Sequence, residues 1–453
     1  MEEIRLLAPT AILGYGFPLD SFYRAMEMKP HLIGVDAGST DPGPYYLGKG
    51  KSFTDRVSVK RDLEIILDAA CETGIPVLIG TAGGSGGKIH VDWTMDIVKE
   101  VIQEKKNRLT VARIDAEFSR EFVLSRLKSG EITPLPGVPS LTEKDVEEST
   151  RIVGQMGIEP FQQAMELGAQ VVVAGRTYDP VCFAALPVLW GFDMGLSLHL
   201  GKILECAAIA ATPGSGRDCM LGILRKDHFL LRPANPQRRC TPESVAAHSL
   251  YEKSDPFHLH GPGGSLDLTE TVYEQYDERT VKVSRTRFIQ APYAVKLEAA
   301  RKVGYRSVCI AGTRDPVMIS KIEDIIKGVK EGVADNFVQS EDTYLHFRLY
   351  GMEGVMGELE PEPVKGHELG IIIEAVASSQ EKANTLLSFA RSTMLHYGFP
   401  GRLSTAGNLA FPYSPSDLEA GEVYTFSMYH LVKNIDPLSP FPVTIEKWGG
   451  EHL

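Results

Sequence analysis

The sequence predicts an α/β protein built from two domains, and three observations support that class. In the first half, short apolar runs alternate with stretches of helical period, which is typical of a doubly wound, mostly parallel sheet covered on both faces. Pro, Asn and Arg then cluster in residues 232–241, a change of composition at which we place the domain boundary. Beyond it, short strands surround longer helical stretches. We therefore expect a Rossmann-like α/β domain with a Gly-rich loop in residues 1–230 and an α+β domain in residues 231–453.

The elements of the first half follow one another with short connections. The apolar run that ends in Gly80 predicts a buried parallel strand, because such strands face apolar neighbours on both sides. Apolar side chains recur at helical spacing in residues 61–73, and Thr142 with Asp145 has the pattern of a capping box that opens a helix. The expected strands are residues 4–8, 31–35, 75–80, 109–114 and 169–174, and the expected helices are residues 18–28, 61–73, 92–105, 161–167, 181–189 and 197–211.

The second half has the pattern of an α+β domain with a partly antiparallel sheet. Thr241 and Pro242 predict a helix start, with Thr as the N-cap and Pro in the first turn. The expected strands are residues 280–284, 307–311, 344–350 and 369–377, and the expected longer helices are residues 317–336 and 380–396.

A Gly-rich loop follows the strand at residues 75–80 and precedes a helix. Glycines allow sharp turns and close approach to a ligand, and a helix N-terminus offers unpaired N–H groups to an anion. The loop matches neither the dinucleotide fingerprint nor the Walker pattern, so we expect no nicotinamide or Walker-type nucleotide site. A tight turn without a ligand is the alternative. The candidate carboxylate- or phosphate-binding residues are Gly83, Gly84, Ser85, Gly86, Gly87 and Lys88.

Polar residues also follow the other strands of the predicted sheet. Ligands of open α/β sheets bind outside the carboxyl ends of the strands, so these residues are candidates for catalysis. Carboxylates in pairs could move protons or hold a cation such as Mg²⁺, and the planar fork of an arginine suits a carboxylate or phosphate. The alternative is that Asp and Gly after strands only make turns. The candidate catalytic residues are Asp36, Asp41, Asp115, Glu117, Arg176 and Asp179.

Two weaker patterns bear on metal and thiol chemistry. His258 and His260 would share a face of a strand and could form half a metal site, with a surface turn as the alternative. Cys182 and Cys206 lie among apolar residues, which favours inert core thiols over nucleophiles. The sequence contains no Gly-x-Ser-x-Gly elbow, which disfavours a serine hydrolase of the common α/β type.

The bulk properties exclude several classes of partner. A net charge of −12, without a long basic run, argues against nucleic acid or an anionic membrane surface. The 6 cysteines are scattered without a CxxC pair, which predicts reduced thiols in a cytoplasmic protein. The acidic start, MEEIR, lacks an apolar signal core, and apolar stretches such as residues 369–377 are too short to span a bilayer.

Several segments of the chain resemble the acyclic terpene utilisation A (AtuA-like) family, long described as a domain of unknown function. They are residues 36–43 (DAGSTDPG), 81–86 (TAGGSG), 172–179 (VVAGRTYD), 199–205 (HLGKILE) and 312–316 (GTRDP). The family takes its name from gene clusters for the breakdown of branched terpenoid acids through coenzyme A thioesters. Related members occur beside enzymes that handle hydroxylated or branched dicarboxylic acids. The resemblance implies an enzyme of carboxylic-acid or acyl-CoA catabolism, and it carries over no catalytic residue.

Together these observations predict a lyase or hydratase that acts on a small hydroxylated or branched polycarboxylate or its CoA thioester. In this hypothesis the Gly-rich loop binds one carboxylate or phosphate, Arg176 binds a second carboxylate, and one of the candidate acids moves the proton. The alternative is a non-catalytic or partner-dependent subunit, or a ligand-binding protein. A homo-oligomer or a complex with a small partner subunit agrees with either function.

Overall fold

The computed structural model describes residues 2–250, 255–337, 343–362 and 364–449, and its chain forms two compact units. The first unit contains Met1–Arg301 and Phe426–Leu453, and the second contains Lys302–Thr425. These units divide the chain at other points than residues 230 and 231. The physical reason is a shared sheet, because strands before and after residues 232–241 pair with one another in the first unit.

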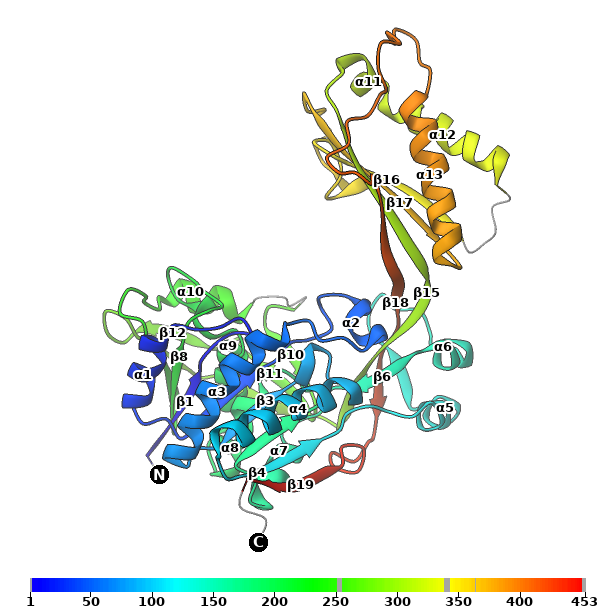
Figure 1. The fold of residues 1–453 in the computed structure, drawn as a ribbon. Coiled ribbons are helices and arrows are strands. Elements are labelled where there is room, and N and C mark those ends of the chain that lie inside the picture. The colour runs from blue at the N-terminus through cyan, green and yellow to red at the C-terminus, as the bar shows by residue number, and fades with distance from the viewer. Residues whose placement is uncertain (1, 251–254, 338–342, 363, 450–453) are drawn as a thin grey trace. The chain divides into compact units, whose positions relative to one another are not determined.

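The first unit is organised around a ten-stranded mixed sheet (Figure 1). In spatial order its strands are β12 (Val272–Gln275), β13 (Val281–Ser284), β9 (His228–Pro233), β8 (Met220–Arg225), β1 (Glu3–Ala8), β2 (Leu32–Asp36), β3 (Val77–Gly80), β7 (Val171–Ala174), β4 (Leu109–Ile114) and β19 (Val443–Trp448). The run from β1 to β4 is parallel, and the remaining pairs are antiparallel. The α/β class is therefore confirmed, but the sheet is mixed rather than mostly parallel. A connection as short as that between β8 and β9 can join only antiparallel strands.

Helices cover both faces of this sheet. Successive strand side chains point to opposite faces, so Ile33 and Val35 pack with one set of helices, whereas Leu32 packs with the other. The first set includes α1 (Leu19–Glu27), α3 (Arg56–Thr73) and α4 (Lys88–Lys105), and the second includes α7 (Glu159–Glu166), α8 (Val181–Leu189) and α9 (Met194–Leu204). Burial on both faces explains why these strands are continuously apolar in sequence.

Side-chain caps fix several helix ends that the sequence predicts. Thr142 and Asp145 form the expected capping box of α6 (Glu143–Glu148), and Thr241 caps α10 (Pro242–Ser249). The further elements of the first unit are α2 (Pro44–Lys49), α5 (Arg120–Lys128), β5 (Ile132–Pro134), β6 (Arg151–Gly154), and a three-stranded sheet of β10 (His258–Gly261), β11 (Gly264–Asp267) and β14 (Arg287–Gln290). No described helix combines the length and apolar composition needed to cross a membrane.

The second unit has the split βαβ order of a ferredoxin-like motif (Figure 1). Its sheet has the order β16, β17, β15, β18, and Ile371 and Ile373 of this sheet pack with Ile322 and Leu387 of its helices. The elements in chain order are β15 (Ala294–Thr313), α11 (Pro316–Ser320), α12 (Ile322–Asn336), β16 (Tyr344–Tyr350), β17 (Leu369–Ala377), α13 (Gln380–His396) and β18 (Asp417–Lys433). The α+β pattern predicted for this part of the chain is present, with the helix expected at 317–336 divided into α11 and α12.

Candidate functional site

The polar residues that follow β2, β3, β7 and β4 lie side by side at one edge of the large sheet. Asp36 is the last residue of β2 and pairs with Gly80 at the end of β3. The Thr81 N–H donates to the Gly175 carbonyl at 3.0 Å, and this bond places the β3 and β7 connections next to each other. These strand ends therefore lie close together, as predicted, because the carboxyl ends of parallel strands share one edge of the sheet.

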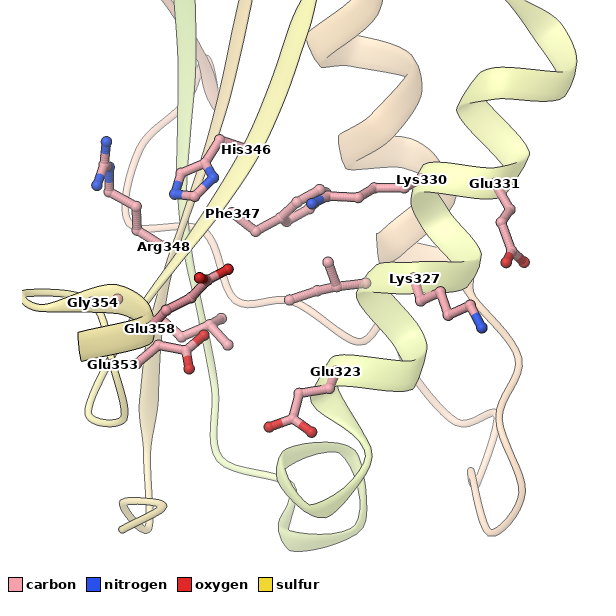
Figure 2. Close-up of a pocket in the computed structure, with 13 residues that line it drawn as sticks. Glu323, Lys327, Lys330, Glu331, His346, Phe347, Arg348, Glu353, Gly354 and Glu358 are labelled. Carbon is pink, nitrogen blue, oxygen red and sulfur yellow. The ribbon is translucent and has the colours of Figure 1, made fainter. Parts of the chain in front are cut away.

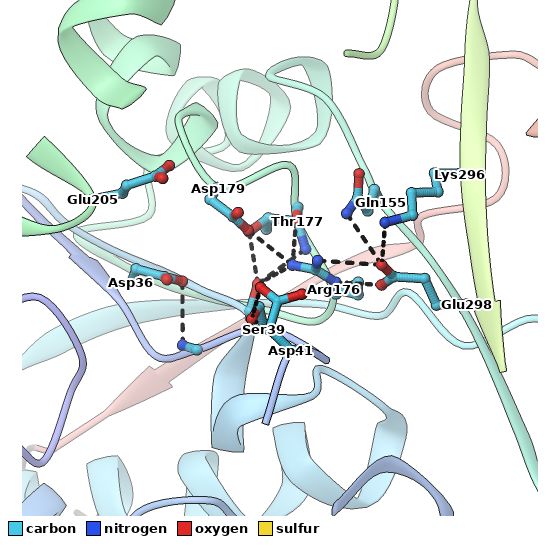
Figure 3. Close-up of polar contacts among 12 residues, drawn as sticks. Asp36, Ser39, Asp41, Gln155, Arg176, Thr177, Asp179, Glu205, Lys296 and Glu298 are labelled. Atoms are coloured by element: carbon cyan, nitrogen blue, oxygen red, sulfur yellow. Dashed lines mark hydrogen bonds and ion pairs between the residues drawn. The ribbon is translucent and has the colours of Figure 1, made fainter. Parts of the chain in front are cut away.

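Arg176 is the centre of the polar contacts at this edge and is 2% exposed. Its Nε donates to Glu298 Oε2 at 2.6 Å, and its Nη1 donates to Asp179 Oδ1 and to the Thr177 carbonyl, both at 2.8 Å (Figure 3). Burial alone would lower the pKa of Arg176, but Glu298 and Asp179 raise that pKa well above its usual value. The guanidinium is thus held by carboxylates of its own chain.

Glu298, on β15, is the buried partner of Arg176 and was not predicted from the sequence. It is 0% exposed, and its Oε1 also forms an ion pair with Lys296 Nζ at 2.7 Å. Burial alone would raise the pKa of Glu298, but the charges of Arg176 and Lys296 lower it to about 2. The available signal was a single acidic residue inside the apolar run of residues 294–300, which is unusual for a buried strand.

Asp36 differs from Glu298 because its pKa is displaced in the opposite direction. The side chain is buried at the end of β2, and its Oδ1 accepts the Gly38 N–H at 3.3 Å. Burial raises the pKa of Asp36 well above its usual value, and the charges of Asp179 and Glu205 raise it further. This environment favours the neutral, protonated carboxyl group.

Glu205 and Lys202 add a second buried ion pair near Asp36. Lys202 lies in α9 and contacts the carboxylate of Glu205, which follows the helix. Burial alone would lower the pKa of Lys202, but Glu205 raises it. We call Asp36, Arg176, Asp179, Lys202, Glu205, Lys296 and Glu298 the charged cluster. The neighbouring Cys182 is buried with a raised pKa, which agrees with the inert thiol expected from the sequence.

The Gly-rich loop packs against neighbouring backbone rather than lying open. Gly86 has φ +67°, and a Cβ there would lie 2.1 Å from the Arg176 backbone nitrogen. A Cβ on Gly83 or Gly84 would likewise approach His90 or Phe53 within 3.0 Å. These contacts account for the glycines without an anion. Anion binding by this loop stays a prediction.

Of the remaining loop residues, Lys88 is the first residue of α4, Gly87 is its N-cap, and Ser85 ends the turn of residues 82–84 that precedes them. This helix begins at Lys88 rather than at the expected residue 92, and the Lys88 N–H donates to Glu117 Oε2 at 2.7 Å. That contact places a carboxylate of the chain itself at the helix N-terminus. Ser85 is 1% exposed, and among the described residues its hydroxyl has no hydrogen-bond partner.

Three predicted acids lie outside the contacts of Arg176. Asp115 pairs with Arg113 at 2.8 Å, and Glu117 caps α4 as described above. Asp41 is exposed and accepts the Ser39 hydroxyl at 2.6 Å, which forms a local turn of the kind expected as the alternative. The structure thus brings together Asp36, Arg176 and Asp179 from the predicted set, and adds Glu298 and Glu205.

The family comparison covers most of the chain. The model of the acyclic terpene utilisation family protein AtuA matches residues 51–215 and 227–412. The chain belongs to the AtuA family. The matched residues include the Gly-rich loop, Arg176, Asp179 and Glu298, whereas Asp36 and Asp41 precede them. No curated protein and no solved structure matches the chain.

The sequence analysis leaves Mg²⁺ open as a possible cofactor of this AtuA family member. Across the described part of the chain, no group of three or more His, Cys, Asp or Glu is arranged to hold a metal ion. His258 and His260 contact Asp255 and Ser265 instead. We therefore derive no chemical step through a metal.

A groove of about 710 Å³ lies in the second unit of this AtuA family member, between α12 and β16 (Figure 2). It contains charged side chains of both signs, and Lys330 extends over the ring of Phe347, with Nζ 5.9 Å from the ring centroid. None of the predicted site residues lines it. Its charged residues are Glu323, Lys327, Lys330, Glu331, Arg348, Glu353 and Glu358.

Proposed function

We propose that this AtuA family protein is an enzyme, a lyase or hydratase, that acts on a branched or hydroxylated carboxylic acid or its CoA thioester. The observation that carries the proposal is Asp36, a buried carboxyl group with a raised pKa, next to Asp179, which Arg176 holds by an ion pair of 2.8 Å. A buried carboxyl group that favours its protonated form can give a proton as the acid, and a neighbouring carboxyl group can take one up as the base. The family name supports the substrate class, because the utilisation of acyclic terpenes is a catabolic process that handles branched carbon chains.

The proposed step is the loss or addition of water across a carbon–carbon bond. In the dehydration direction, Asp179 removes a proton from the carbon next to the substrate carbonyl, and the C–O bond of the neighbouring hydroxyl breaks. Asp36 gives its proton to the leaving hydroxyl, which departs as water while the double bond forms. Asp36 then recovers the proton that Asp179 gained, and hydration follows the same path in reverse.

Arg176 acts in this scheme as a positioning residue. Its guanidinium nitrogens already contact Glu298, Asp179 and the Thr177 carbonyl, which supports a role in orienting Asp179 in place of the predicted contact with a substrate carboxylate.

A ligand screen followed by turnover measurements tests the proposal. Thermal shifts are recorded with CoA thioesters, hydroxy-dicarboxylates and tricarboxylates, each with and without Mg²⁺, because a ligand of the folded state raises stability by mass action. Acids that bind are then assayed for gain or loss of water by mass spectrometry. We expect Asp36→Asn to reduce turnover by about 10²–10⁴-fold, the usual contribution of a general acid.

Asp92→Asn is the matched control, because Asp92 is a half-exposed acid that pairs with Arg113 outside the charged cluster. It should leave turnover unchanged. Equal turnover by Asp36→Asn and the unmodified protein would refute the proposal. Absence of any thermal shift and of any turnover would favour the partner-dependent subunit.

A further inference from the structure

A cavity of about 530 Å³ lies inside the first unit, and its volume is typical of small-molecule sites. Its walls come from the start of α7, the residues after β7, α9, and the small sheet with the segment that follows β14. Most of this lining is apolar, with Ile158, Val181, Met194, Leu198, Pro262 and Phe288 as the main side chains. Such a lining binds a hydrocarbon chain by removing it from water.

Polar groups line part of the same cavity. The Tyr293 hydroxyl donates to Glu159 Oε2 at 2.8 Å and accepts the Gly157 N–H at 3.2 Å. These hydrogen bonds hold the Tyr293 and Glu159 side chains in place, so one side of the cavity is polar and ordered. The cavity therefore has an apolar body and a small number of placed polar groups, which is the usual composition of a ligand site.

Tyr178 connects this cavity to the charged cluster. Its ring lines the cavity and packs on Gly261, where a Cβ would lie 2.6 Å from a ring carbon. Tyr178 directly precedes Asp179, a member of the charged cluster, in the segment that follows β7. The residue is 7% exposed, and its hydroxyl has no hydrogen-bond partner among the described residues. A ligand oxygen that accepts this hydroxyl would remove the cost of a buried, unpaired donor.

We propose that the cavity binds the apolar acyclic chain of the substrate, and that the Tyr178 hydroxyl donates to a carboxyl or thioester oxygen at the head of that chain. The head group then lies at Tyr178, whose neighbour in the chain is Asp179 of the charged cluster. This inference rests on the proposed function and narrows its substrate to an acid with a hydrocarbon tail, in place of a small polycarboxylate that is polar throughout.

Isothermal titration calorimetry of the full chain tests the inference with three probes: octanoate, a methyl-branched octanoate and succinate. We expect the two tailed acids to bind at least about tenfold more tightly than succinate, which corresponds to about 1.4 kcal/mol. Leu198→Phe fills the cavity and should weaken the tailed acids at least about tenfold. The matched control is Leu167→Phe, because Leu167 is 56% exposed and lies outside the cavity. It should bind all three acids as the unmodified protein does.

Two more variants keep the test decisive. Phe288→Ala enlarges the cavity and should shift preference from octanoate to dodecanoate, which tests the site even where Leu198→Phe fails to fold. Tyr178→Phe keeps the ring and removes the hydroxyl, so it should weaken the tailed acids without changing their preference over succinate. Succinate binding as tightly as octanoate, or octanoate binding unaffected by both cavity variants, would overturn the inference.

The outcome for Asp36→Asn separates this inference from the proposed function. We expect that variant to bind the tailed acids while it loses turnover. Cavity-dependent binding together with normal turnover by Asp36→Asn would reject the acid–base assignment and leave the chain-binding site standing.

Discussion

The charged cluster of the first unit and the groove of the second unit both contain Glu, Lys and Arg side chains, yet they differ in burial. Arg176 and Glu298 are 2% and 0% exposed, whereas the side chains of Glu323 and Arg348 in the groove are 65% and 46% exposed. Water and salt screen the exposed charges, while the buried charges act on one another strongly. The difference teaches that charged residue types alone do not mark a catalytic site. Burial with specific partners does, because it changes proton affinities.

The largest expected effect comes from breaking the buried ion pair. Glu298→Gln keeps the size of the side chain but leaves Arg176 with less compensating charge, so we expect the free energy of unfolding to fall by about 3–5 kcal/mol. Urea denaturation followed by circular dichroism measures the change. A loss below about 1 kcal/mol is typical of an exposed ion pair. Such a result would show that charge interactions in the buried cluster are no stronger than those in the exposed groove.

The acid stability of the first unit should also depend on Glu298. Its pKa is about 2 in the folded protein, below the ordinary value of 4.5, so its stabilising contribution is present above pH 4.5 and is lost as the pH falls toward 2. The shift corresponds to roughly 3 kcal/mol. We expect the free energy of unfolding, measured by urea denaturation at several pH values between 4.5 and 2, to fall more steeply with decreasing pH for the unmodified protein than for Glu298→Gln. The same pH dependence of stability in both proteins would contradict the lowered pKa of Glu298.

A backbone test addresses the close packing of the Gly-rich loop. Gly86→Ala should destabilise by about 2–5 kcal/mol, because the new Cβ meets the Arg176 backbone and the positive φ is strained. Gly137→Ala is the matched control, since Gly137 has φ +78° but nothing within 4 Å of the new Cβ. Gly137→Ala should lower the free energy of unfolding only by the cost of placing an alanine at a positive φ, about 1 kcal/mol. Equal losses in thermal denaturation would mean that close packing is not the reason for Gly86.

Asp36 should show the opposite pH dependence to Glu298. Its folded pKa is raised, so the stability linked to its proton is present below the unfolded pKa and is lost as the pH rises through the folded pKa. Asp36→Asn cannot ionise and should be more stable than the unmodified protein at neutral pH, by about 0.5–2 kcal/mol. The gain should disappear below pH 4 in urea titrations. An equal or lower stability of Asp36→Asn at neutral pH would contradict the burial argument.

The smallest effect is expected in the groove of the second unit. Glu323→Gln should change the free energy of unfolding by less than about 0.5 kcal/mol and leave turnover unchanged, because its side chain is 65% exposed. The same urea and mass-spectrometric assays apply. A loss of turnover in this variant would indicate that the groove of the second unit takes part in catalysis.

The sequence by itself determined the local elements and the edge of the sheet where polar residues gather. The apolar run before Gly80, the repeat in residues 61–73 and the capping box at Thr142 are each decided by neighbours along the chain, so periodicity and capping chemistry were enough to predict them. The placement of Asp36 and Arg176 at the carboxyl ends of parallel strands followed from the same reasoning.

Only the tertiary structure decided which of the polar residues share contacts and which carry perturbed proton affinities. Glu298 is 122 residues away from Arg176 in sequence, and no local pattern indicates that they form one ion pair. Asp41 and Asp36 look alike in sequence, yet one is exposed and the other is buried beside further carboxylates. The physical reason is that burial and electrostatic coupling depend on distances between elements remote in the chain, whereas helix and strand periodicity depend on distances of a few residues.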